Sequence, residues 1–124
     1  LFPQSHGYQY KGYYLNSEKR PTFMYEYGSI KIEDFFEDHL NDNGKAFFTR
    51  TVTFTTTAKQ EPFFFRLGSG KEIKKNGTSW NVDRLSLGLH EDMKILIREG
   101  DTKDLLLPVQ LSKGKTIIKI DYKW

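Results

Sequence analysis

The chain of 124 residues contains no cysteine. This absence excludes disulfide bonds, thiolate metal sites, cysteine nucleophiles and covalent attachment of a c-type haem. Long apolar runs are missing as well, since none approaches the roughly 18 residues that a membrane-spanning helix needs. The sequence therefore predicts no membrane insertion and no bound cofactor.

An excess of one charge is also lacking, because 16 acidic residues offset most of the 19 basic ones and leave a net charge of +3. Proteins that bind nucleic acid through its phosphates need a clustered basic stripe. Here Lys and Arg alternate with Asp and Glu, and the short basic run at Lys71, Lys74 and Lys75 is interpreted as a solvated turn. The sequence predicts no nucleic-acid partner.

Aromatic side chains, in contrast, are abundant at 15% of the chain, and they favour strands. Apolar and polar residues alternate in many short runs, most clearly from Thr116 to Trp124. Such runs recur at the spacing of about 8–12 residues that is typical of sandwiches and barrels. The pattern predicts an all-β fold, an antiparallel and jelly-roll-like β-sandwich, with an open β-barrel as the alternative.

Turn signals divide these runs into at least seven expected strands. A hairpin is expected around Gly28-Ser29, and the last two strands are expected to pair as a second hairpin around 112–115. Helix is expected for one or two turns at most, within Ile32–Leu40. Residues 1–124 are expected to form one domain, with 1–7 as a loosely ordered lead-in. Because the sequence starts abruptly at Leu1 without a methionine, the chain is interpreted as a processed or excised piece of a longer protein.

The alternating runs also predict which side chains form the core. In each run, the apolar residues that share one face are expected to point between the sheets. The residues expected to be largely buried are Phe23, Tyr25, Val52, Phe54, Leu87, Ile95, Leu107, Ile118 and Ile120.

Candidate metal ligands are few. The histidines at 6, 39 and 90 have no metal-binding spacing, and a zinc site needs several ligands that converge on one point. Calcium favours oxygen-rich acidic loops, which makes Asp38 and Asp42 the candidate ligands. The order of residues does not match an EF-hand loop, because His39 falls where the first aspartate would be. The interpretation is a solvated loop without a metal.

No constellation of catalytic residues stands out. Ser69 lies between Gly68 and Gly70, which is neither the spacing nor the context of a nucleophile elbow. A carboxylate pair for glycoside hydrolysis stays open, because the chain has sixteen acidic residues and nothing selects two of them. The chain is therefore interpreted as a non-catalytic domain, with a small hydrolase as an alternative.

Some aromatic residues have a polar setting that suits a ligand. Trp80 lies in a polar stretch with Asn81 and Asp83, and Tyr8 and Tyr10 belong to the tyrosine-rich first strand. Aromatic faces with polar groups beside them can stack on sugars, so this set gives a carbohydrate-binding module as the alternative function. The favoured interpretation is that Trp80 fills the end of the sandwich and that half of the tyrosines belong to the core.

The first third of the chain also carries a resemblance to a known family. From Gly12 to Asp34 it reads G-Y-x-L-x-x-x-x-R-P-T-F-x-Y-x-x-G-x-I-x-I-E-D. This segment resembles a β-domain of large exported bacterial proteins that combine a sorbosone/PQQ-type dehydrogenase-like propeller with a c-type cytochrome module. The closing pattern, from Leu107 to Tyr122 and Trp124, is similar as well.

The resemblance implies a context more than an activity. It implies a periplasmic or secreted location and an accessory domain that contacts neighbouring domains or a protein partner. No redox role transfers to this chain, because the relatives carry haem on a CxxCH motif. Within the motif, Pro21 is expected to open a strand, and Arg20 is expected to pair with Glu33 or Asp34 across the hairpin.

Overall fold

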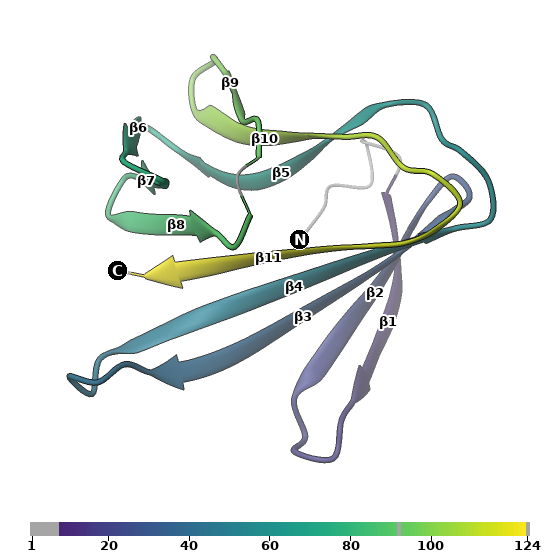
Figure 1. Ribbon diagram of the computed structural model, residues 1–124, viewed down its shortest axis with the longest axis horizontal. Helices are drawn as coiled ribbons and strands as arrows, with labels where there is room; N and C mark the ends of the chain where they lie inside the picture. Colours follow the sequence, from purple (N-terminus) through teal and green to yellow (C-terminus); the bar gives the residue numbers. More distant parts are fainter. Residues whose placement is uncertain (1–7, 92, 124) are drawn as a thin grey trace.

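The computed structural model describes residues 8–91 and 93–123, and all regular elements in this part of the chain are β-strands (Figure 1). The strands are β1 (Tyr8–Leu15), β2 (Pro21–Tyr27), β3 (Ile30–Leu40), β4 (Ala46–Thr56), β5 (Phe63–Gly70), β6 (Ile73–Asn76), β7 (Ser79–Val82), β8 (Leu85–Leu89), β9 (Leu96–Arg98), β10 (Lys103–Val109) and β11 (Gly114–Lys123). The predicted lead-in, with His6, and the terminal Trp124 lie outside the described residues. The described part contains no helix that is long and apolar enough to cross a membrane.

The strands form two antiparallel sheets. One has eight strands in the order β1-β2-β3-β4-β11-β8-β7-β6, and the other has three in the order β5-β10-β9. Figure 1 shows the smaller sheet lying over one face of the larger one, while the β1–β2 and β3–β4 hairpins extend beyond it. The predicted all-β sandwich is confirmed, and the sheets do not close into a barrel.

The hairpin predicted around Gly28 is confirmed. Tyr27 pairs with Ile30, and Gly28 adopts a φ of 59° in the two-residue turn. Side chains disfavour this left-handed backbone, so a glycine here favours a tight connection between β2 and β3.

The helical turns predicted within Ile32–Leu40 are wrong, because this segment is most of strand β3. Ile30, Ile32 and Asp34 alternate on one buried face, and the strand pairs with β4 from Lys31 to Leu40. The polar and apolar residues of this segment also allow a helix locally. Pairing with two neighbouring strands outweighs that weak local preference.

The predicted pairing of the last two strands is also wrong. β10 lies between β5 and β9 in the small sheet, whereas β11 lies between β4 and β8 in the large one. The chain crosses from one sheet to the other after Val109, and the buried Leu111 holds the crossing against the core. Each strand therefore pairs with residues far away in the sequence, which a short turn signal cannot indicate.

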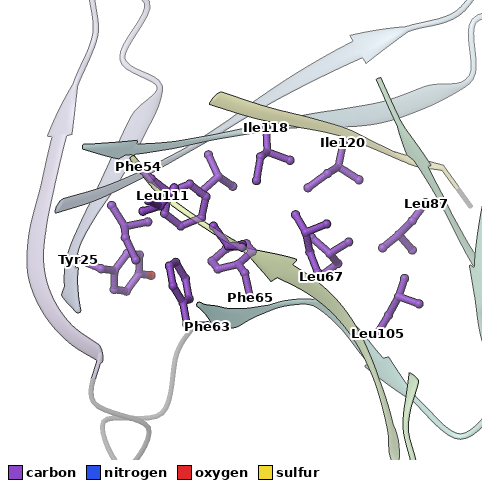
Figure 2. Packing of buried hydrophobic residues seen from close by; sticks show 14 of the residues in the cluster. Tyr25, Phe54, Phe63, Phe65, Leu67, Leu87, Leu105, Leu111, Ile118 and Ile120 are labelled. Atoms are coloured by element: carbon purple, nitrogen blue, oxygen red, sulfur yellow. The ribbon is translucent and has the colours of Figure 1, made fainter. Parts of the chain in front are cut away.

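The core fills the space between the two sheets (Figure 2). Phe54 of the large sheet meets Phe65 of the small sheet edge to face, with their ring centroids 5.3 Å apart. Aromatic pairs prefer this arrangement. The predicted core is confirmed at seven positions, and Phe23 and Ile95 are only partly buried but pack against it. The seven are Tyr25, Val52, Phe54, Leu87, Leu107, Ile118 and Ile120.

Candidate functional site

Trp80, the aromatic residue singled out from the sequence, lies on β7 opposite Leu87 of β8. Partners across a sheet share a face, so the indole lies on the side of the core and packs against its margin, half-buried. The ammonium of Lys75 lies 5.7 Å from the ring centroid. Trp80 therefore fills the end of the sandwich and also presents an accessible edge.

A groove of about 930 Å³ opens beside Trp80. The β6–β7 hairpin forms one side of it, and the segment that follows β8 forms the other. Its polar lining consists of Lys75, Thr78, His90, Glu91 and Lys94. Its apolar lining, besides the indole, consists of Leu89, Met93 and Ile95.

The other members of the predicted sugar site do not join Trp80 at this groove. Tyr10 lies on β1, and five strands separate β1 from β7 in the sheet order. Asn81 follows Trp80 directly in the strand and so points to the opposite face. Asp83 accepts hydrogen bonds from the backbone N–H groups of residues 71 and 72, at 3.1 and 2.9 Å, and thereby holds the turn before β6. The side chain of Tyr8 lies outside the described residues.

A second candidate is a row of rings that we call the aromatic face, formed by Tyr13 of β1, Phe23 of β2 and Phe36 of β3. The ring centroids of Tyr13 and Phe23 are 6.1 Å apart, and those of Phe23 and Phe36 are 6.4 Å apart. The strand register places all three on the same side as the core residues Tyr25 and Ile32. Nevertheless Tyr13 is 58% exposed and Phe36 is 38% exposed.

A buried ionic network lies between Phe36 of the aromatic face and the core. Arg50 of β4 donates hydrogen bonds to both carboxylate oxygens of Asp34, at 2.8 and 2.7 Å, and to the hydroxyl of Tyr122 at 3.1 Å. The Tyr122 hydroxyl donates in turn to the carbonyl of Leu67 at 2.9 Å. The guanidinium carbon lies 5.4 Å from the ring centroid of Phe36. The network therefore joins the two sheets where the covered surface ends.

The electrostatics of this network favour a structural role. Burial alone would lower the pKa of Arg50, but the hydrogen bonds and the negative charge of Asp34 raise it above its ordinary value. Burial also raises the pKa of the Tyr122 hydroxyl. Neither group exchanges a proton near neutral pH, which a general acid or base must do.

A further cluster, Thr49, Asp121 and His90, superficially suggests a catalytic triad. The Thr49 hydroxyl donates to Asp121 Oδ1 at 2.7 Å, and His90 Nε2 lies 2.9 Å from the same oxygen. In a nucleophilic triad the histidine must contact the hydroxyl and take its proton. Here the carboxylate lies between them, so the cluster links β4, β11 and the end of β8 without activating a nucleophile.

The two weak metal candidates, Asp38 and Asp42, do not share the predicted acidic loop, because Asp38 lies in strand β3. Asp38 lies 3.4 Å from Arg20, and Asp42 is exposed in the β3–β4 turn. Within residues 8–91 and 93–123 no group of three or more potential metal ligands converges.

The expected pairing of Arg20 with Glu33 or Asp34 is wrong, since Arg20 contacts Glu18, Glu37 and Asp38. The reason is register: Thr22 pairs with Phe35, which brings residue 20 opposite residue 37.

Sequence reasoning did not find the aromatic face or the lysines of the groove. Phe36 was detectable in principle, because it continues the alternation of Ile30, Ile32 and Asp34 on one face of β3. Lys94 carries no such signal. It lies outside the strands and joins the groove only because the segment after β8 passes near the β6–β7 hairpin.

The resemblance in the first third of the chain concerns β1, β2 and the start of β3, the elements that carry two of the three rings of the aromatic face. Pro21 opens β2, as predicted.

The chain was also compared with known families, proteins and structures. No protein-family model, no curated protein and no solved structure matches the chain.

Proposed function

We propose that this chain is a non-catalytic interaction domain that docks on a neighbouring domain or a protein partner through the aromatic face. The observation that supports the proposal is the exposure of Tyr13 and Phe36 in a contiguous row of rings. Contiguous exposed apolar patches are typical of interaction sites. Aromatic residues are also enriched at the anchoring positions of such interfaces.

The surroundings of the aromatic face favour a protein surface over a sugar as its occupant. A sugar needs hydrogen-bonding groups beside the ring on which it stacks. The nearest buried polar groups, Asp34 and Arg50, already bond to each other and to Tyr122. An apolar partner can cover the rings without disturbing those bonds.

The family resemblance supplies the context in this proposal. The domain would be an accessory part of an exported, multidomain bacterial protein, possessing no redox group of its own. Its partner would then be another domain of the same polypeptide or a protein in the periplasm or outside the cell. The structural roles of Asp34, Arg50, Asp121 and His90 are in keeping with a domain that binds and does not catalyse.

Photo-crosslinking in the source cell tests this proposal. A photoreactive phenylalanine analogue replaces Tyr13 in one variant and Ile117, which is 54% exposed on the opposite face of the large sheet, in the control. We expect the analogue at 13 to crosslink to one defined segment of the same polypeptide or of one protein, and the analogue at 117 not to do so. Equal and scattered crosslinks from both positions would contradict the proposal.

A further inference from the structure

The groove beside Trp80 lies far from the aromatic face in the strand order, so it is a second surface whose use goes beyond the proposed docking function. Its volume of about 930 Å³ exceeds what one side chain needs and lies in the range of small-molecule sites. Its lining combines one large aromatic ring with several polar side chains. That combination is typical of sites that fix a ring-shaped polar ligand.

Two lysines of the groove are available to a ligand. Lys75 and Lys94 are exposed, and within residues 8–91 and 93–123 neither has a carboxylate at ion-pair distance. Lys74, the neighbour of Lys75 on the other face of β6, pairs with Glu72 at 3.9 Å. Glu91 is the one acidic residue among the described lining residues, so this part of the lining carries a small positive excess.

The contact between Lys75 and Trp80 indicates which ligand charge the groove prefers. Cations are attracted to the face of an indole ring, and the ammonium lies 5.7 Å from the ring centroid. A neutral sugar that stacks on this face would displace the cation without giving it a new partner. An acidic sugar would replace the cation–π contact by an ion pair.

Hydrogen-bond donors are available as well. The Trp80 side chain is half-buried, and its indole N–H has no hydrogen-bond partner among the residues that the structure describes. Thr78 is exposed in the turn between β6 and β7. Hydroxyl groups of a ligand can accept from the indole and exchange hydrogen bonds with Thr78 and Glu91.

We propose that this groove binds an acidic saccharide, with a pyranose ring stacked on Trp80 and its carboxylate paired with Lys75 and Lys94. The stacking surface selects for a ring, and the lysines select for the carboxylate. Because the lysines are exposed, salt screens their contribution and binding weakens as ionic strength rises.

The test is a titration of the whole chain with three soluble polyuronates: polygalacturonate, alginate and hyaluronate. Two-dimensional NMR follows the indole N–H signals, and isothermal calorimetry gives the affinity. Methyl-esterified polygalacturonate keeps the ring without the charge, and polyglutamate keeps the charge without the ring. We expect at least one polyuronate to bind and to shift the Trp80 signal, and neither control polymer to do so.

Matched variants assign the binding to the groove. We expect Lys75→Gln and Lys94→Gln each to weaken binding by about two- to fivefold, as for exposed ion pairs, and Lys74→Gln to leave it unchanged. Trp80→Phe, checked for folding by circular dichroism, should weaken binding by more than either lysine variant. The proposal is overturned if no polyuronate binds, if a control polymer binds equally well, or if Lys74→Gln has the same effect as Lys75→Gln.

Discussion

Two regions on the inner face of the large sheet differ in what covers them. Under the small sheet, the inward residues Val52, Phe54 and Ile120 are fully buried. Towards the β1–β2 and β3–β4 turns, the aromatic face lies on the same side, but two of its three rings, Tyr13 and Phe36, are exposed. The change occurs within a single strand, since Ile32 of β3 is 0% exposed and Phe36 of the same strand is 38% exposed. Alternation thus selects a face, whereas the second sheet decides whether that face is core.

The border between the two regions is polar. Asp34 and Arg50 occupy inward positions where an apolar residue would continue the core, and Arg50 lies between the rings of Phe36 and Phe65. The ion pair therefore lies between Phe36 and the core, whereas Phe23 still packs against the margin of the core. Burying this ion pair costs the free energy of desolvation. Even so, no buried side-chain nitrogen or oxygen among the described residues lacks a hydrogen-bond partner.

The largest expected effect tests the covered region. Phe54→Ala should lower the free energy of unfolding by about 3–5 kcal/mol, because it removes a buried ring that contacts Phe63 and Phe65. Urea denaturation measures the loss. The matched variant Phe36→Ala removes the same atoms from the exposed region and should cost less than half as much. Equal losses would show that the two regions do not differ in packing.

The next effect concerns the border. Arg50→Met should cost about 3 kcal/mol, since it leaves the carboxylate of Asp34 buried without its partner. The double variant Arg50→Met with Asp34→Leu should recover most of that loss, because both charges are then absent. A double variant that is less stable than Arg50→Met would show that the loss does not come from leaving Asp34 without its partner.

A smaller effect depends on pH. Burial alone would raise the pKa of Asp121, but hydrogen bonds with His90 and Thr49 lower it below its ordinary value. A carboxylate with a lowered folded-state pKa stabilises the protein above its unfolded-state pKa of about 3.9, and this stability is lost as the pH falls through the folded value. Melting temperatures measured from pH 6 to pH 2 should therefore fall less steeply for Asp121→Asn than for the natural chain. Parallel curves would show that the cluster of Thr49, Asp121 and His90 adds no acid-sensitive stability.

The smallest expected effect on stability is at the aromatic face. Tyr13→Ser should change the free energy of unfolding by about 1 kcal/mol or less, because the side chain is exposed and loses one ring contact with Phe23. The same variant should abolish docking if the proposed function is correct. Chemical denaturation measures the effect of Tyr13→Ser on stability. Crosslinking from an analogue at a second position on the aromatic face, Phe36, measures its effect on docking. A loss of several kcal/mol would place Tyr13 in the core instead.

The candidate sites were only partly predictable. Trp80 stood out because a tryptophan in a polar stretch is unusual, and the structure does place it at a groove. Its expected companions Asn81 and Asp83 were chosen by closeness in sequence, and they point to the other face or hold a turn. Lys75 faces Trp80 across the β6–β7 hairpin, which the turn signal at Asn76-Gly77 could have indicated, whereas Lys94 comes from a later segment that the local sequence does not connect with Trp80.

Local pattern was sufficient for the fold class, the hairpin at Gly28 and most of the core, because side chains alternate across any strand whatever its partners. It was not sufficient for the partner of each strand. β10 and β11 follow each other closely yet belong to different sheets, and the tertiary structure alone decided this. The physical reason is that a hairpin and a crossing to the other sheet both begin with a polar turn. Burial of Leu111 between the sheets, together with pairing to distant strands, selects the crossing.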